Sequence, residues 1–392
     1  MANFSKLIEK KADAAQYMVD EITHICKDMP KRTPGEEGER IACEYMADVL
    51  KKDCGCERSD VESFKENPGS FFGWIYITIT CVLAGLIAYF FLPILGFALI
   101  VFGFYVMIMQ FGLYKKTFDF LFPEKTGTNV TAIKKCTGEV KGRVFFNGHP
   151  DAAWNWPVNN KFGGKVYEAN IVIVVLGALF LMGCSLATAI LTGFKPMILK
   201  PENGVLFWLG IANDNLTACL MGIAILKAMK DEGIELEHTE VGVILSGSEE
   251  AGLRGAKAWC EQHKGEFDDV PTWIYSFDTI HDPKFLGVNY RDLNATVKAD
   301  KEVSDSFMEA AKELGIHCNK TLVPPFGGAT DSAAFAQAGF RATGITALNH
   351  VLEDYYHTLK DSYDNLNKDC LADCYAISVR ALENFDKKIS NK

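Results

Sequence analysis

The stretch Arg-Val-Phe-Phe-Asn-Gly-His-Pro-Asp, residues 143–151, decides how the rest of the chain is interpreted. Arg143 to Asn147 is typical of a short buried strand, and Gly148-His149-Pro150-Asp151 follows it directly. Two later apolar strands end in the same manner. Val241–Leu245 runs into Ser246-Gly247-Ser248-Glu249-Glu250, and Thr272–Phe277 runs into Asp278. Because ligands of parallel sheets gather at the carboxyl ends of the strands, these side chains are expected at one sheet edge.

Strands and helices alternate through most of the chain, which predicts an α/β fold with a mostly parallel, mixed sheet flanked by helices. The strands 129–135 and 143–147 are expected to be neighbours, with Thr137 and Gly138 in the turn between them. The other strands are expected at 59–65, 241–245, 272–277 and 342–346, and helices at 4–26, 36–50, 216–229, 255–263, 303–314, 332–338 and 369–388.

A long apolar run interrupts this pattern. Residues 71–114 contain no Asp, Glu, Lys, Arg or His, and these 44 residues are about twice the length of one membrane-spanning helix. They predict a transmembrane helical hairpin that turns near Pro93 and Gly96. The aromatic residues Trp74, Tyr76 and Tyr114 would suit the two membrane interfaces.

The charges around this hairpin predict its orientation. Basic residues flank it on both sides, whereas its turn carries no charge, so both flanks are expected on the cytoplasmic side. The flanking basic residues are Lys51, Lys52, Arg58, Lys65, Lys115, Lys116 and Lys125. The alternative is a buried hairpin inside a soluble protein.

A second charge-free run covers Asn170 to Phe194 and is long enough to cross a bilayer. If His149 and Asp214 belong to one site, the chain between them crosses the membrane twice or not at all. We therefore expect a broken or re-entrant hairpin bent near Gly183, with an interfacial helix as the alternative.

Composition excludes other classes of function. The net charge is −10 and the pI is about 5.4, so the chain offers no basic face for a nucleic acid. The twelve cysteines are scattered, and Cys54 and Cys56 are too close for a paired metal hook, which indicates free thiols in a reducing compartment. The N-terminus lacks the apolar stretch of a cleaved signal peptide.

Two further residues carry metal-binding chemistry. Asp214 lies in Ala212-Asn213-Asp214-Asn215 just ahead of a predicted helix, where a helix-capping role is the alternative. His357 lies in Tyr355-Tyr356-His357-Thr358, where it could also be an ordinary loop histidine.

The ordered set resembles the M28 family of zinc aminopeptidases and related exopeptidases. This set comprises His149, Asp151, Asp214, Glu249, Glu250, Asp278 and His357. Arg32-Thr33-Pro34-Gly35 and the loop from Gly328 to Phe335 also resemble stretches of that family. The related M20 peptidases insert a lid before the last histidine, and the 79 residues from Asp278 to His357 leave little room for one.

The resemblance implies a role for each residue. Asp214 would bridge two zinc ions, one also held by His149 and Asp278, and the other by Glu250 and His357. Co²⁺ or Mn²⁺ could replace the zinc.

The same resemblance implies that Glu249 is the general base, that Tyr356 helps to stabilise the oxyanion, and that Asp151 orients His149. Ser332 stands where the family more often has an aromatic residue or histidine, so the pocket wall is expected to differ, and Asp331 is an additional candidate.

The sequence thus predicts an integral membrane metallopeptidase, an exopeptidase of the aminopeptidase type, whose partners are a peptide or other amide substrate and a lipid bilayer. Its hydrolase domain would comprise residues 1–67, 121–167 and 208–392, with a transmembrane hairpin at 71–114 and a hydrophobic membrane-associated insertion at 168–207. Two alternatives remain: an amidohydrolase acting on N-acyl amino acids or lipid amides, and a non-catalytic membrane scaffold on the same fold.

Overall fold

The computed structural model describes residues 4–194, 217–325, 327–348, 355–358, 360 and 362–391. Within this part, eight strands form one mixed sheet in the order β1-β2-β4-β3-β5-β10-β6-β9. The strands are β1 Arg58–Glu66, β2 Lys125–Lys134, β3 Gly142–Gly148, β4 Thr239–Ser246, β5 Thr272–Ile280, β6 Gly287–Asn289, β9 Asn319–Thr321 and β10 Arg341–Ala347. The short strands β7 Arg291–Asp292 and β8 Val297–Lys298 pair separately. The four central strands, β4-β3-β5-β10, are parallel to one another.

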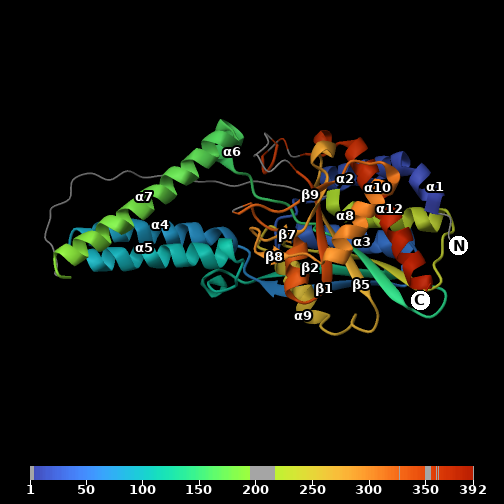
Figure 1. Ribbon diagram of the computed structural model, residues 1–392, viewed down its shortest axis with the longest axis horizontal. Coiled ribbons are helices and arrows are strands. Elements are labelled where there is room, and N and C mark those ends of the chain that lie inside the picture. Colours follow the sequence, from blue (N-terminus) through green and yellow to red (C-terminus); the bar gives the residue numbers. More distant parts are fainter. Residues whose placement is uncertain are drawn as a thin grey trace.

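Helices cover both faces of this sheet (Figure 1). Strand β3 explains why, because successive side chains of a strand point to opposite faces. Phe145 belongs to the core cluster that contains Trp259 and Phe335, Phe146 belongs to the cluster that contains Leu220 and Leu382, and each phenylalanine is 1% exposed. The helices of the globular part are α1 Phe4–Glu9, α2 Lys11–Asp28, α3 Glu37–Lys52, α8 Thr217–Asp231, α9 Arg254–Gln262, α10 Lys301–Leu314, α11 Asp331–Gln337 and α12 Lys368–Ser390. The predicted fold class is therefore confirmed.

The predicted pairing of the second and third strands is wrong. Strand β4 lies between β2 and β3, antiparallel to β2 and parallel to β3. The backbone N–H groups of Thr137 and Gly138 donate to the carbonyls of Leu236 and Glu237, so the predicted turn instead pairs with the segment that enters β4. Strand β4, which comes about 100 residues after β3 in the chain, thus takes the place beside β2 that was predicted for β3.

The first apolar run forms a hairpin of two helices, as predicted. Helix α4 is Ser70–Tyr89, and α5, Pro93–Met107, continues into the π-helix η1, Ile108–Gly112. Pro93 begins α5, but Gly96 does not mark the turn. It lies inside α5, where an added Cβ would come 2.8 Å from the carbonyl oxygen of Gly85, so the glycine permits close packing of the two helices. We call residues 70–112 the apolar hairpin.

The predicted bend near Gly183 is wrong. Helix α7, Gly164–Leu191, runs through that position without a break and follows the short helix α6, Pro157–Phe162. Its far end reaches the turn of the apolar hairpin, since the hydroxyl of Thr188 donates to that of Tyr89 at 3.3 Å. Seven consecutive residues near its start, 168–174, are exposed on every side of the helix, so α7 packs on the hairpin only farther along.

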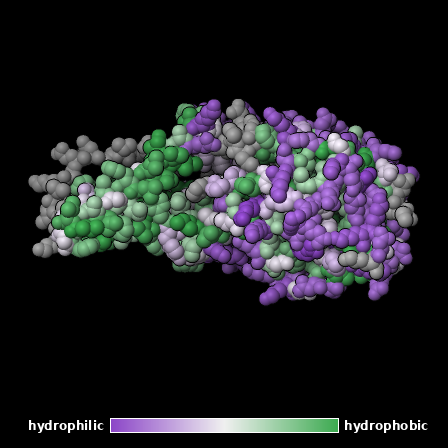
Figure 2. Space-filling view, in the orientation of Figure 1, coloured by the Kyte–Doolittle hydropathy of each residue, from purple (hydrophilic) through white to green (hydrophobic). Residues whose placement is uncertain are grey.

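Together, α4, α5 with η1, and α7 form an apolar rod that projects from the globular part (Figures 1 and 2). Each is long and apolar enough to cross a membrane. Tyr114, expected at a membrane interface, is instead 7% exposed and packs against Phe71 inside the protein, so that expectation is wrong.

Candidate metal centre

The central strands deliver the predicted side chains to one edge of the sheet. Strand β3 lies between β4 and β5, and all three run in the same direction. His149 follows the last residue of β3, Glu249 and Glu250 lie in the turn after β4, and Asp278 is two residues from the end of β5. The topology therefore gathers residues that are up to 129 positions apart in the sequence.

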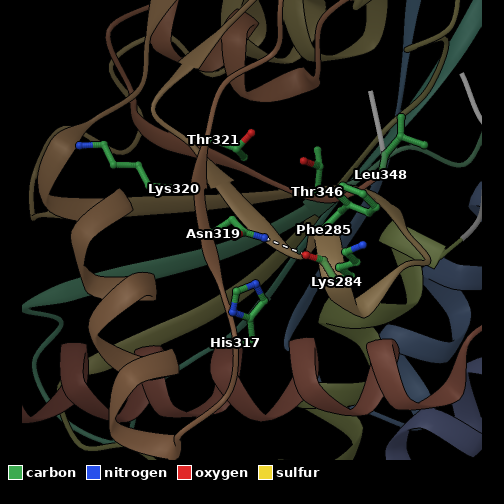
Figure 3. Close-up of a pocket in the computed structure, with 8 residues that line it drawn as sticks. All are labelled: Lys284, Phe285, His317, Asn319, Lys320, Thr321, Thr346 and Leu348. Carbon is green, nitrogen blue, oxygen red and sulfur yellow. Dashed lines mark hydrogen bonds between the residues drawn. The ribbon is translucent and has the colours of Figure 1, made fainter. Parts of the chain in front are cut away.

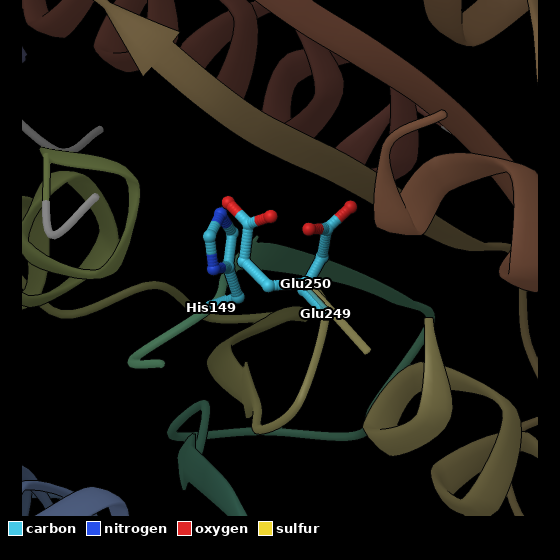
Figure 4. Close-up of side chains that lie close together, drawn as sticks. All are labelled: His149, Glu249 and Glu250. Carbon is cyan, nitrogen blue, oxygen red and sulfur yellow. The ribbon is translucent and has the colours of Figure 1, made fainter. Parts of the chain in front are cut away.

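These side chains are close enough to share a cation. His149, Glu249 and Glu250 each offer one ligand atom, and these atoms lie within 4.8 Å of one another. Figure 4 shows the imidazole and the two carboxylates projecting to the same side. The Nε2 atom of His149 is 3.9 Å from Oδ1 of Asp278, and Nε2 of His357 is 3.7 Å from Oε1 of Glu250. Both predicted histidine–carboxylate pairs are thus brought together.

Asp151 is buried beneath this cluster, with an exposed fraction of 0%. Its Oδ1 lies 3.3 Å from Nδ1 of His149 and accepts the backbone N–H of Glu249 at 3.0 Å. Its Oδ2 accepts the backbone N–H of Glu250, also at 3.0 Å. One carboxylate therefore fixes both the histidine ring and the turn that carries the two glutamates.

His357 and Tyr356 are supported by a residue that the sequence did not single out. The ring of Trp156 packs against His357 at 4.4 Å and against Tyr356 at 5.8 Å, and its backbone N–H donates to the carbonyl of His357. Trp156 also stacks on Tyr167 of α7, and Asn159 of α6 donates to the carbonyl of Tyr356. Tryptophan beside a helix start carries no metal-binding signal, which is why only the structure identifies it.

The electrostatics of the cluster suit a cation. Burial raises the pKa of Glu249 well above its usual value, and the charges of Glu250 and Asp278 raise it further. Burial lowers the pKa of His357 to about 3, which keeps that imidazole neutral and able to donate a lone pair. Burial also opposes the protonation of His149, but Asp151 and Asp278 outweigh it and raise that pKa. A bound cation would relieve the mutual repulsion of these carboxylates.

Asp331 lies under the site and ends a buried hydrogen-bond chain. Ser276 donates to Asn147, Asn147 donates to Ser246, and Ser246 donates to Oδ2 of Asp331, each at 2.6 Å. This chain links β5, β3 and β4 to the start of α11. Burial raises the pKa of Asp331 to about 7. Asp214 lies outside the described residues.

A pocket lies away from these residues, between η3 Pro283–Phe285, β9 and β10 (Figure 3). None of the residues that line it is a predicted site residue. It presents Lys284, Lys320 and His317, and no carboxylate among the described residues lines it. The pocket therefore lacks the combination of histidines and carboxylates found around His149 and Glu250, and these residues remain the candidate metal centre.

The described donors fit a zinc site. Imidazole and carboxylate groups are the ligands that Zn²⁺ takes in catalytic sites. The Nδ1 atom of His149 has a carboxylate partner, as metal-binding histidines usually do, which leaves Nε2 for the metal.

Comparison with solved structures supports the fold. A zinc aminopeptidase from Bacillus subtilis aligns with a TM-score of 0.56 at 13% identity, covering 95% of each chain. An aminopeptidase from Aneurinibacillus sp. strain AM-1 aligns with a TM-score of 0.55 at 12% identity, covering 96% of this chain and 93% of the other. A glutaminyl cyclase from an Acidobacteriales bacterium aligns with a TM-score of 0.53 at 13% identity, covering 96% and 95%.

No curated protein matches the chain. The family model described as Peptidase family M28 matches residues 182–382, which is just over half of the chain and includes Glu249, Glu250, Asp278 and His357. The chain belongs to peptidase family M28.

Proposed function

We propose that this protein is a membrane-anchored zinc exopeptidase, of the aminopeptidase type, that holds two zinc ions. His149 and Asp278 would bind one ion, Glu250 and His357 the other, and Asp214 would bridge them. The observation that carries the proposal is the pairing of each histidine with its carboxylate, at 3.9 Å and 3.7 Å, around the turn that bears Glu249.

Bound zinc would act as a Lewis acid toward the substrate carbonyl and would lower the pKa of water at the site. Glu249 would take the proton from the attacking water and return it to the leaving amine. The Glu249 residue is 7% exposed, so this proton exchange would take place away from bulk water. Asp151 would hold His149 and the Glu249 backbone in place, and the Tyr356 hydroxyl would donate to the developing oxyanion.

The aminopeptidase direction is supported by the printed descriptions of the B. subtilis and Aneurinibacillus structures, which are aminopeptidases. Two of the similar structures are described as glutaminyl cyclases, so a peptide with N-terminal glutamine is included in the screen below.

Membrane anchoring is supported by three helices that are long and apolar enough to span a bilayer. Because basic residues flank the apolar hairpin and its turn has none, we place the catalytic domain on the cytoplasmic side.

The test is a substrate screen on detergent-purified protein with added zinc. One peptide is offered with a free amine, with an acetylated amine, with an amidated C-terminus and with N-terminal glutamine, alongside N-acyl amino acids and a lipid amide. We expect release of the N-terminal residue from the free-amine peptides only. Cleavage restricted to the N-acyl compounds would make the protein an amidohydrolase, and turnover of none of them would favour a scaffold.

A matched pair of variants ties any activity to this site. Glu249→Gln removes the proposed base, whereas Glu261→Gln changes an exposed glutamate of α9. Activity lost in the first variant and kept in the second excludes a contaminating peptidase.

A further inference from the structure

The ends of the apolar hairpin hold the turn that carries Glu249 and Glu250. This turn, residues 247–253 and here called the Glu249 turn, links β4 to α9. It has an unusual backbone, because Ser248 and Leu253 both have positive φ, at 54° and 60°. Non-glycine residues keep such angles only where the surroundings enforce them.

One enforcing contact comes from the strand that leads into the hairpin. The hydroxyl of Ser248 lies 2.5 Å from Oε1 of Glu66 and 2.8 Å from Oε1 of Glu39. Glu66 is the last residue of β1, four positions before α4, and is 4% exposed. The residue directly before Glu249 is therefore held by Glu39 of α3 and by the end of β1, the strand that leads into the apolar hairpin.

A buried ion pair fixes the other end of the turn. Arg254, 2% exposed, donates through Nη2 to Oδ1 of Asp119 at 2.9 Å and to the hydroxyl of Ser70 at 3.3 Å. Ser70 donates to the same Asp119 oxygen at 2.7 Å, and Gln110 of η1 donates to it at 3.2 Å. Ser70 begins α4, and Asp119 follows η1, so this cluster joins both ends of the hairpin to the first residue of α9.

The middle of the turn is held as well. Lys257 donates to the carbonyls of Tyr114, at 2.6 Å, and Gly252, at 2.9 Å, and so bridges the hairpin exit to the turn. The ring of Phe71 lies against the same part of the turn, since a Cβ on Gly252 would come 2.9 Å from it. Gly252 in turn donates its N–H to the carbonyl of Glu249 at 2.8 Å.

We infer that the apolar hairpin and the residues that follow it position the general base and a metal ligand, in addition to anchoring the chain. Ser70 of the hairpin and Asp119, which follows it, act on the Glu249 turn through Arg254, and Lys257 links Tyr114, also after the hairpin, to the turn. The positioning residues are Ser70, Asp119, Arg254 and Lys257, because their contacts reach the site only through the turn. The inference rests on the proposed function for its catalytic part, whereas its metal-binding part needs only Glu250.

The test compares Asp119→Asn with Thr78→Val in full-length protein in detergent. Asp119→Asn removes the charge that faces buried Arg254, and Thr78→Val removes a hydrogen bond between α4 and α5 that lies away from the turn, from the Thr78 hydroxyl to the carbonyl of Gly103 at 3.0 Å. Zinc affinity is measured by competition with a chromophoric chelator, and kcat and KM at saturating zinc. We expect Asp119→Asn to weaken zinc binding about tenfold and to lower kcat about tenfold with KM within twofold, as for other supports of metal ligands. Thr78→Val should leave all three values unchanged.

Unchanged zinc affinity in folded Asp119→Asn protein would overturn the inference, whether or not the wild type cleaves peptides. If Asp119→Asn does not fold, Ser70→Ala replaces it, since it deletes one hydroxyl and leaves the ion pair, and a two- to threefold weaker zinc affinity is then expected. A wild type that binds zinc and shows the Asp119→Asn shift but cleaves no amide would refute the proposed function and leave the positioning role standing.

Discussion

Replacing Asp151 with asparagine changes one oxygen to an amino group at the point where the histidine and the two glutamates meet. The carboxylate accepts from the backbone N–H groups of Glu249 and Glu250, at 3.0 Å each, and lies 3.3 Å from Nδ1 of His149. An amide has only one oxygen. If that oxygen takes the Oδ1 position, the amino group must face the N–H of Glu250, and two donors then oppose each other.

The expected loss of zinc affinity follows from the number of hydrogen bonds that the asparagine cannot make. One charge-assisted hydrogen bond is removed, and such a bond contributes about 1.5–3 kcal/mol. At 1.4 kcal/mol per tenfold, zinc affinity should fall roughly 10- to 150-fold if the whole loss reaches the ligand Glu250. Mutations of residues that support metal ligands usually cost about 10- to 100-fold, which agrees with this range.

The assay is a zinc titration of Asp151→Asn against a competing chromophoric chelator at pH 7.5, with folding checked by thermal unfolding. Asp268→Asn, at an exposed position, is the matched control and should bind zinc as the wild type does. Wild-type affinity in folded Asp151→Asn protein would show that the carboxylate does not hold the ligands, and the reasoning would fail.

Four other predictions test the site and its setting. Glu249→Ala should keep its zinc and lose activity by about 10²- to 10⁴-fold, and a fully active variant would refute the assignment of the base. Asp214→Ala should lose bound zinc by elemental analysis, whereas unchanged content would refute the bridging role. Burial raises the pKa of Glu66 from 4.5 to about 7, so the folded protein should lose stability as pH rises from about 4.5 to 7. Glu66→Gln should make the stability less dependent on pH in this range, and should raise the Tm at pH 7.5 but not at pH 4.5. In intact cells, a membrane-impermeant maleimide should label Phe91→Cys, at the hairpin turn, and not Lys65→Cys, and efficient labelling of the latter would reverse the orientation.

The gathering of His149, Glu250 and Asp278 at one sheet edge could be predicted because its signal is local. A buried strand followed within five residues by His149, Glu250 or Asp278 combines hydropathy with ligand chemistry in one short segment. The same local signal located α4 and α5 to within a few residues. The short strands β6 and β9, of three residues each, are too brief to produce a periodic pattern.

Features that depend on distant contacts could not be predicted. Hydropathy is the same for one long helix and for a bent one, so it did not distinguish a break at Gly183 from the continuous α7. Strand β4 pairs with β2 on one side and with β3 on the other, and no residue of β2 or β3 signals that a strand about 100 positions away separates them. The contact between Asp119 and Arg254 spans 135 positions, and each residue alone is indistinguishable from a surface charge.

The starts of α4 and α7 bear on how a substrate of the proposed membrane-anchored enzyme would arrive. Phe72 packs on Trp154 at 5.2 Å, and Tyr167 stacks on Trp156 at 5.0 Å, so both helices begin beside residues that closely follow Asp151 in the chain. A bilayer around these helices would bring its surface close to Trp156, whose ring packs against His357 at 4.4 Å. A folded protein is too bulky to approach a reaction centre lying close to a lipid surface, whereas a loose chain end can bend down to it. Steric exclusion by the bilayer would then select substrates before any pocket residue does.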